Sequence, residues 1–202
     1  MAAPFDITVC GIEELAGHCA AGVTHVLSIL DPLWPVPPAF GTFGEHERLE
    51  LRFHDVIEEN AGMISPAPEH IAHLLAFGRD LILEPPPSGH LLVHCHAGVS
   101  RSTASMALIL AEALPDRPGA EIFDEVLRIR PKAWPNLRIV EIGDAMLGRR
   151  GELVAAAHLV YRRQIERRPE MAEIMAGAGR LREVEAAMRA GGSASTVTAP
   201  LR

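Results

Sequence analysis

The segment that most constrains the fold is a buried strand that runs into a short loop and then directly into a helix. Residues 90–94 (HLLVH) form an apolar run of strand length, and residues 102–114 show helical spacing. Only the short loop 95–101 separates them. A helix after a strand carries the chain back to begin a parallel neighbour, so this segment predicts an α/β fold.

The same alternation of strand and helix occurs elsewhere in the first half of the chain. Strands are predicted at residues 7–10, 24–30 and 48–54, and helices at residues 12–19 and from 65 or 66 to about 83. The intervening residues 31–44 contain four prolines, which predicts an irregular loop. We therefore expect a central, mostly parallel sheet covered on both faces by helices.

The second half of the sequence is helical, with helical spacing at residues 121–129, 137–147, 152–168 and 171–188. We predict one domain at residues 1–150, a helical C-terminal extension at 151–190, and a disordered tail at 191–202, where Ser, Thr, Gly and Ala dominate. The arginines of the extension are interpreted as a solvated face, with a docking role as the alternative: Arg162, Arg163, Arg167 and Arg168.

Charge and cysteine content limit the setting and the partners of the protein. The net charge of −7 argues against general binding to nucleic acid or to an anionic membrane. No apolar run approaches the ~20 residues that span a bilayer, and the N-terminus has no signal-peptide pattern. The three cysteines, Cys10, Cys19 and Cys95, are a poor disulfide framework. We expect a cytoplasmic protein with no nucleic-acid or membrane partner.

The loop that begins at Cys95 has the residue types needed to hold one tetrahedral anion. Its backbone N–H groups, from His96, Ala97, Gly98, Val99 and Ser100, can point inward around the anion, and the following helix N-terminus adds further donors. Gly98 permits a close backbone approach, and Arg101 supplies a planar fork that matches two phosphate oxygens. The same donors favour the thiolate of Cys95, so the loop predicts a nucleophile placed beneath a bound phosphoryl group.

The nine residues His94-Cys95-His96-Ala97-Gly98-Val99-Ser100-Arg101-Ser102 resemble the signature of the protein tyrosine phosphatase superfamily, closest to its dual-specificity branch. Weaker similarities extend to residues 21–27 and to the Arg-Pro and Pro-Asn pairs within 130–136. The resemblance implies a phosphomonoester hydrolase that forms a phosphocysteine on Cys95. It also implies that Ser102 assists departure of the sulfur, that His94 braces the loop, and that neither a cofactor nor a metal takes part.

The reaction also needs a group that protonates the leaving oxygen. In the superfamily this acid is an aspartate on a loop that follows a core strand, and Asp55 fits because it follows the predicted strand 48–54. Glu58 and Glu59 on the same loop, and Asp31 after the earlier strand, are the alternatives. Asp55 can also be read as a turn-former at the end of a strand.

The expected substrate is a phosphorylated protein or a small aromatic phosphoester, and phosphate or sulfate should be able to occupy the loop. The loop has none of the lysines that lipid-phosphate relatives often carry. Two other functions remain open. One is a catalytically weak phosphate-binding pseudophosphatase module that lacks a working acid. The other is a rhodanese-like sulfurtransferase, against which the Ala-Gly-x-Ser-Arg-Ser sequence argues.

Several side chains near these segments have two interpretations. Trp34, Phe40 and Phe43 either reach the rim of the phosphate pocket or simply pack the loop on the core. Trp134 is interpreted as a packing residue, and His96 as a residue at the pocket mouth. An oxidised protein could join Cys10 or Cys19 to Cys95 in a protective disulfide.

Overall fold

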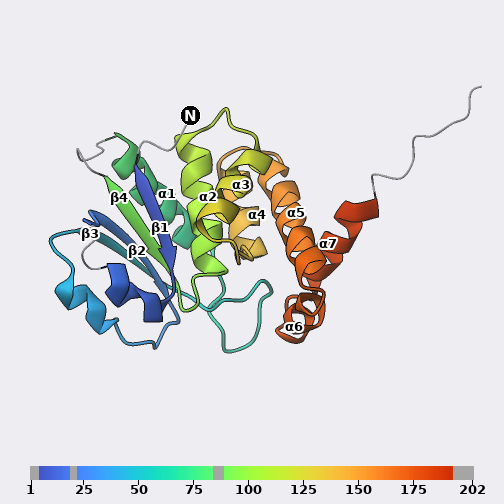
Figure 1. The fold of residues 1–202 in the computed structure, drawn as a ribbon, viewed down its shortest axis with the longest axis horizontal. Helices are drawn as coiled ribbons and strands as arrows, with labels where there is room; N and C mark the ends of the chain where they lie inside the picture. Colours follow the sequence, from blue (N-terminus) through green and yellow to red (C-terminus); the bar gives the residue numbers. More distant parts are fainter. Residues whose placement is uncertain (1–4, 19–21, 84–88, 193–202) are drawn as a thin grey trace, which may run out of the picture.

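In the described part of the chain, four strands form one parallel sheet (Figure 1), which confirms the prediction from the sequence. The computed structural model describes residues 5–18, 22–83 and 89–192. The sheet has the order β1-β4-β2-β3, with all neighbours parallel. Its strands are β1 (Asp6–Cys10), β2 (His25–Leu30), β3 (Glu47–Arg52) and β4 (His90–His94).

The register of the strands places the start of the loop 95–101 near the middle of one sheet edge. His94, the last residue of β4, pairs with Cys10 on β1 and with Ser28 on β2. The loops that follow all four parallel strands therefore meet at the carboxyl edge of the sheet. Open α/β sheets bind ligands at this edge.

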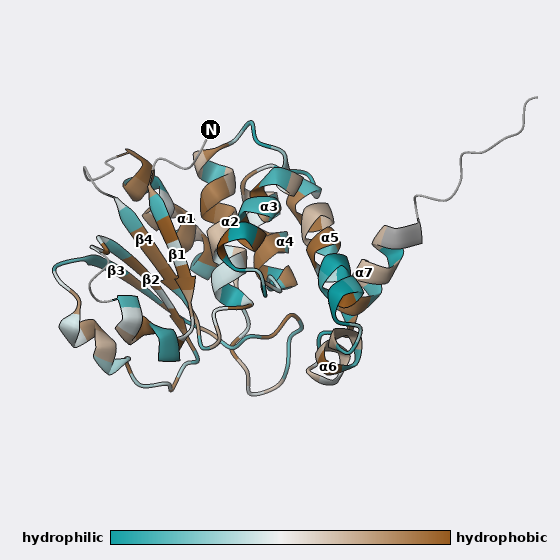
Figure 2. Ribbon diagram, in the orientation of Figure 1, coloured by the Kyte–Doolittle hydropathy of each residue, from teal (hydrophilic) through white to brown (hydrophobic). Residues whose placement is uncertain are grey.

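The α-helices cover one face of the sheet, and two short 3₁₀ helices cover the other. α1 (Pro68–Leu83), α2 (Arg101–Ala113) and α3 (Gly119–Ile129) contact the strands, and α4 (Leu137–Met146) packs on α1 and α2. α2 is buried almost all round, and Figure 2 shows apolar residues along it and along the strands that it faces. This helical layer explains the large core cluster on that face.

The opposite face of the sheet has a smaller cluster, formed with η1 (Ile12–His18) and η2 (Pro38–Thr42). Leu15 of η1 and Phe40 of η2 pack there on β2 and β4. The expectation of an irregular loop over residues 31–44 is wrong for η2. Pro38 occupies the first turn of the 3₁₀ helix, where its fixed φ suits the helical backbone and its missing N–H is not needed.

Up to residue 192, where the described residues end, three helices follow the α/β part of the chain: α5 (Glu152–Arg167), α6 (Met171–Gly177) and α7 (Leu181–Gly192). The single helix expected at residues 171–188 is two helices, because Gly179 adopts a positive φ of 77° between them. α5 packs on α3 and α4, and α7 packs on α5. Tyr161 and Val184 belong to the main core cluster. The extension therefore shares a core with the preceding helices.

The ends and the surface of the extension bear on two further expectations. Residues 191–192 belong to α7, whereas 193–202 of the expected disordered tail lie outside the described residues. On the surface, Arg162 pairs with Glu166 and Arg163 with Asp124, as expected for a solvated charged face. Among the helices described, none is long and apolar enough to cross a membrane.

Candidate active site

The loop between β4 and α2 holds a buried thiol beside a hydroxyl. The Cys95 side chain is 2% exposed, and its Sγ lies 3.2 Å from Oγ of Ser102, in the first turn of α2. Burial of both groups excludes competing hydrogen bonds from bulk water. Ser102 therefore lies within hydrogen-bond distance of the sulfur, and the role in sulfur departure that the resemblance implied stays a prediction.

The tight turn of this loop depends on Gly98. Its φ of 64° lies in the left-handed region, and a Cβ added there would lie 2.4 Å from the carbonyl carbon of Cys10. The loop is thus packed directly against the end of β1. No side chain fits at this position without moving one of the two backbones.

Replacing Gly98 with alanine should destabilise the protein by about 2–4 kcal/mol, because left-handed strain and backbone overlap act together. The measurement is the free energy of unfolding in urea, with Gly44→Ala as the control. A Cβ added at Gly44 would meet nothing within 4 Å. Equal unfolding free energies for the two variants would show that the loop is not held in this conformation.

The guanidinium of Arg101 is held in place through one of its nitrogens, Nη1. The side chain is 3% exposed, and its Nη1 donates to Oδ1 of Asp31 at 2.6 Å and to the carbonyl of Phe53 at 2.7 Å. Its buried Nε has no hydrogen-bond partner within the described part of the chain. A buried donor without a partner is unfavourable, so Nε is a free donor available to an oxyanion held in the loop.

Asp55, the expected acid, lies against the loop and accepts three hydrogen bonds at one oxygen. Its Oδ1 accepts from Oγ of Ser100 at 2.7 Å, from Nδ2 of Asn136 at 2.9 Å and from Nη1 of Arg180 at 3.1 Å. Burial alone would raise the pKa of Asp55, but the charges of Arg180 and Arg101, together with the hydrogen bonds from Asn136 and Ser100, outweigh it and hold the pKa below its usual value. Asp55 is therefore a carboxylate in the free protein.

The three alternative acids make different contacts. Glu58 pairs with Arg182 at 2.7 Å, and Glu59 pairs with Arg138 at 2.9 Å while its side chain remains 82% exposed. Asp31 is the counter-charge of the loop arginine. Asp31 thus contacts the loop through Arg101, whereas Glu58 and Glu59 pair with arginines outside the loop.

His94 supports the loop from the sheet side. Its Nε2 lies 2.8 Å from Oγ of Ser28 on the neighbouring strand. Burial lowers the pKa of His94 to about 4, so the imidazole is neutral near pH 7. A neutral histidine tied to a neighbouring strand fits the bracing role that the resemblance implied.

Arg130 clamps the loop from its other side, a contact that the sequence did not reveal. Its Nε donates to the carbonyl of Gly98 at 2.9 Å, and its Nη2 donates to that of Ala97 at 3.1 Å. The same guanidinium pairs with Glu14, whose pKa is lowered to about 2 chiefly by this hydrogen bond. With its carbonyls engaged outward, the loop can direct N–H groups inward.

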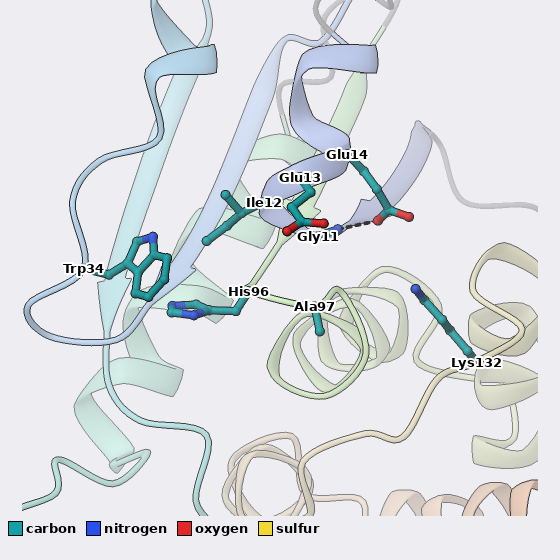
Figure 3. Close-up of a pocket in the computed structure, with 8 residues that line it drawn as sticks. All are labelled: Gly11, Ile12, Glu13, Glu14, Trp34, His96, Ala97 and Lys132. Carbon is teal, nitrogen blue, oxygen red and sulfur yellow. Dashed lines mark hydrogen bonds between the residues drawn. The ribbon is translucent and has the colours of Figure 1, made fainter.

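The mouth beside the loop is lined by two rings. His96 and Trp34 have ring centroids 4.4 Å apart, and Figure 3 shows them facing each other at one side of the pocket. Nε2 of His96 accepts from the N–H of Asp31 at 3.2 Å, and burial lowers the pKa of this histidine. The pocket measures about 490 Å³ and is lined by Gly11, Ile12, Glu13, Glu14, Trp34, His96, Ala97 and Lys132.

The other aromatic residues of the sequence analysis are packing residues. Phe40 is 9% exposed, with its ring 5.4 Å from that of His94 and 5.7 Å from that of Phe43. Trp134 is fully buried and stacks on Tyr161 at 5.0 Å. Trp34 is thus the aromatic side chain of the Pro-rich loop that reaches the pocket.

The cysteines bear on the expected protective disulfide. Cys10 and Cys95 are both free and buried. Burial raises the pKa of Cys10 to about 12, so it is a thiol at neutral pH. Cys19 lies outside the described residues, and the disulfide stays a prediction.

Two side chains of the C-terminal extension that sequence reasoning missed, Arg180 and Glu183, join the hydrogen-bond network of the candidate site. Arg180 contacts Asp55 and Ser100, and it pairs with Glu183 one helical turn later. The available signal was Gly179, directly before Arg180, because a glycine inside a helical pattern often marks a break. The break at Gly179 lets the Arg180 side chain point toward Asp55 and Ser100 and not toward solvent.

The fold described here is that of the protein tyrosine phosphatases. Human DUSP28 superimposes with a TM-score of 0.52 at 19% identity, over 71% of this chain and 94% of that chain. PTP-2 of Cydia pomonella gives 0.53 at 21%, over 69% and 84%. DUSP15 gives 0.53 at 20%, over 83% and 95%. The resemblance noted from the loop sequence is confirmed at the level of fold.

The sequence is also similar to a curated relative, the "MAP kinase phosphatase with leucine-rich repeats protein 2" of Dictyostelium discoideum. The two are 31% identical over 121 residues, which is 58% of this chain and 14% of that protein. The chain therefore matches a small part of the relative's length. No protein-family model matches the sequence.

Proposed function

We propose that the protein is a phosphomonoester hydrolase of the protein tyrosine or dual-specificity type that forms a phosphocysteine on Cys95. The observation that carries this proposal is that the two ends of one loop carry a buried thiol, on Cys95, and an anchored guanidinium, on Arg101, whose Nε has no hydrogen-bond partner in the described part of the chain. The similarity to dual-specificity phosphatases in fold, and to a MAP kinase phosphatase in sequence, supports it.

In the first step, the loop N–H groups and Arg101 hold the phosphoryl oxygens while the Cys95 thiolate attacks phosphorus. A sulfur–phosphorus bond forms, the ester phosphorus–oxygen bond breaks, and the leaving oxygen takes a proton from Asp55. In the second step, water attacks phosphorus and gives a proton to Asp55. The sulfur–phosphorus bond then breaks, with Ser102 donating to the departing sulfur. The products are an alcohol and inorganic phosphate, and no cofactor takes part.

The lowered pKa of Asp55 sets the expected pH dependence. The acid must carry its proton for the first step, and the protonated fraction falls as pH rises through the pKa. Burial opposes the shift, but Arg180 and Arg101 keep the folded pKa low. We therefore expect faster hydrolysis in mildly acidic solution than at neutral pH.

Replacing Asp55 with asparagine should slow hydrolysis of an alkyl phosphate by about 10²–10³-fold, because its leaving oxygen needs a proton. Hydrolysis of p-nitrophenyl phosphate, which has a better leaving group, should fall much less. Rates for both esters test this, with Glu59→Gln as the matched control because Glu59 is 82% exposed. If Asp31→Asn gives the leaving-group dependence instead, Asp31 is the acid.

The mouth of the site supports an aromatic phosphoester, and on a protein this is phosphotyrosine. Trp34 and His96 offer ring surfaces beside the loop. Initial rates with p-nitrophenyl phosphate, a phosphotyrosine peptide and a phosphoserine peptide test this preference, with Cys95→Ser as the blank. Faster turnover of the phosphoserine peptide would contradict it. We also propose a cytoplasmic location, supported by two free buried cysteines.

A phosphate-binding module without turnover is the second candidate function. The observation in its favour is that Asp55 is engaged by three donors and held as a carboxylate. Phosphate binding by the wild-type protein, measured by calorimetry, together with rates equal to those of the Cys95→Ser blank, would favour the module. Turnover above the blank would exclude it.

A further inference from the structure

Arg180 lies between the C-terminal helices and the phosphate-binding loop, at the junction of α6 and α7 (Figure 1). Its side chain is 5% exposed. Nη1 donates to Oδ1 of Asp55 at 3.1 Å, and Nη2 donates to Oγ of Ser100 at 2.9 Å. Ser100 in turn donates to the same carboxylate oxygen at 2.7 Å. Three distant segments of the chain thus form one closed triangle of hydrogen bonds.

Glu183 holds the guanidinium of Arg180 in this position. It is fully buried, and its oxygens accept from Nε and Nη2 of Arg180 at 2.9 and 3.0 Å. The same carboxylate accepts from Nε1 of Trp134 at 2.5 Å and from the N–H of Leu137 at 2.9 Å. The network therefore reaches the segment that carries Asn136, which also donates to Asp55.

A buried ion pair is a poor device for stability alone, because the desolvation of both charges offsets much of their attraction. The extension has apolar means of packing, since Tyr161, Val184 and Ala187 join the main core cluster. Arg180 and Glu183 instead direct charge and hydrogen bonds at Asp55 and Ser100. These two contacts are the reason to assign the pair a role at the site.

We propose that Arg180, fixed by Glu183, is a positioning residue that orients Asp55 and Ser100 for the phosphatase reaction. The C-terminal extension is then part of the active site. This inference rests on the proposed function and on the assignment of Asp55 as the acid. It adds a residue outside the loop signature to the set that controls the rate.

The positive charge of Arg180 has a consequence that can be measured separately from orientation. The charged and titratable groups that face Asp55 are Arg180, Arg101 and His96, with Glu183 behind Arg180. Burial raises the pKa of Asp55, and the two arginines, together with the hydrogen bonds from Asn136 and Ser100, lower it further than burial raises it. Removing the charge of Arg180 therefore raises this pKa, and Asp55 keeps its proton to higher pH.

The test is a comparison of three variants with the wild-type 202-residue chain, using an alkyl phosphate, whose leaving oxygen needs a proton, across the pH range. Arg180→Gln combined with Glu183→Gln removes both charges, so that Glu183 is not left as a buried carboxylate without Arg180. Arg180→Lys keeps the charge but not the fork. Arg189→Gln is the matched control on α7, where Arg189 is 67% exposed and pairs with Glu185.

The double variant should lower kcat by about 10–100-fold through misplacement of the acid, change KM less than threefold, and move the alkaline limb of the rate profile to higher pH. Arg180→Lys should lower kcat less and keep the limb near its wild-type position. Arg189→Gln should match the wild type. A folded double variant with wild-type kcat and an unmoved limb would overturn the inference.

Other outcomes are also decisive. If the double variant does not fold, a wild-type kcat for Arg180→Lys overturns the inference, and a reduced kcat at unchanged KM supports it. Failure of the proposed function looks different, because the wild type itself would then show no hydrolysis above Cys95→Ser.

Discussion

Replacing Cys95 with serine lowers kcat for p-nitrophenyl phosphate by about 10⁴-fold or more, because a hydroxyl cannot replace the thiolate as nucleophile. The loop N–H groups and Arg101 remain, so inorganic phosphate still binds. The hydroxyl of the serine at position 95 also stays within hydrogen-bond reach of Ser102. Steady-state rates and phosphate titration by calorimetry measure the two effects on the same sample.

The matched control is Cys10→Ser, since Cys10 is the other buried free cysteine among the described residues. Burial raises its pKa to about 12, so it is not a thiolate at working pH. We expect its kcat, per folded molecule, to stay within a few-fold of the wild type. Substantial turnover by Cys95→Ser, or equal losses in the two variants, would contradict a cysteine mechanism centred on Cys95.

Replacing Arg101 with lysine should lower kcat/KM by about 10³-fold. A single ammonium cannot reproduce a planar guanidinium that is held through Nη1 while its Nε remains free to donate to the anion. Nη1 holds Asp31 and the carbonyl of Phe53, while Nε is left for the anion. A lysine ammonium that keeps the hydrogen bonds to Asp31 and to the carbonyl of Phe53 no longer reaches the phosphoryl oxygens.

The measurements for this variant are kcat/KM, which should fall, and the inhibition constant of inorganic phosphate, which should rise. Arg79→Lys is the control, because Arg79 lies on α1, is 53% exposed and pairs with Glu112 away from the loop. Wild-type values for Arg101→Lys would mean that the guanidinium serves the fold and not the phosphate.

The loop 95–101 and the α/β fold class of the chain were predictable because their determinants are local in the sequence. Strand, turn and helix preferences all agree from His90 to Leu114, and Gly98 stands where the backbone needs a positive φ. The parallel sheet follows from the same alternation along the chain. The order of the strands does not, because it depends on which apolar faces pack together after collapse.

The partners of the loop were less predictable because they lie far away in the sequence. Asp31 was considered as an acid, yet it meets Arg101, 70 residues later, because β2 lies beside β4. Arg180 lies 125 residues after Asp55. Its contact depends on the break at Gly179 and on the packing of α7 on α5. A solvated arginine and a buried one have the same local pattern.

The most direct test of the central claim is to trap the phosphorylated intermediate. The 202-residue chain would be mixed with p-nitrophenyl phosphate, quenched during turnover, digested, and analysed by mass spectrometry. We expect one phosphoryl group on the peptide that contains Cys95, at the sulfur, and none in Cys95→Ser. A wild-type sample that turns over substrate with no phosphoryl group on Cys95, or with one on a different side chain, would contradict the phosphocysteine mechanism.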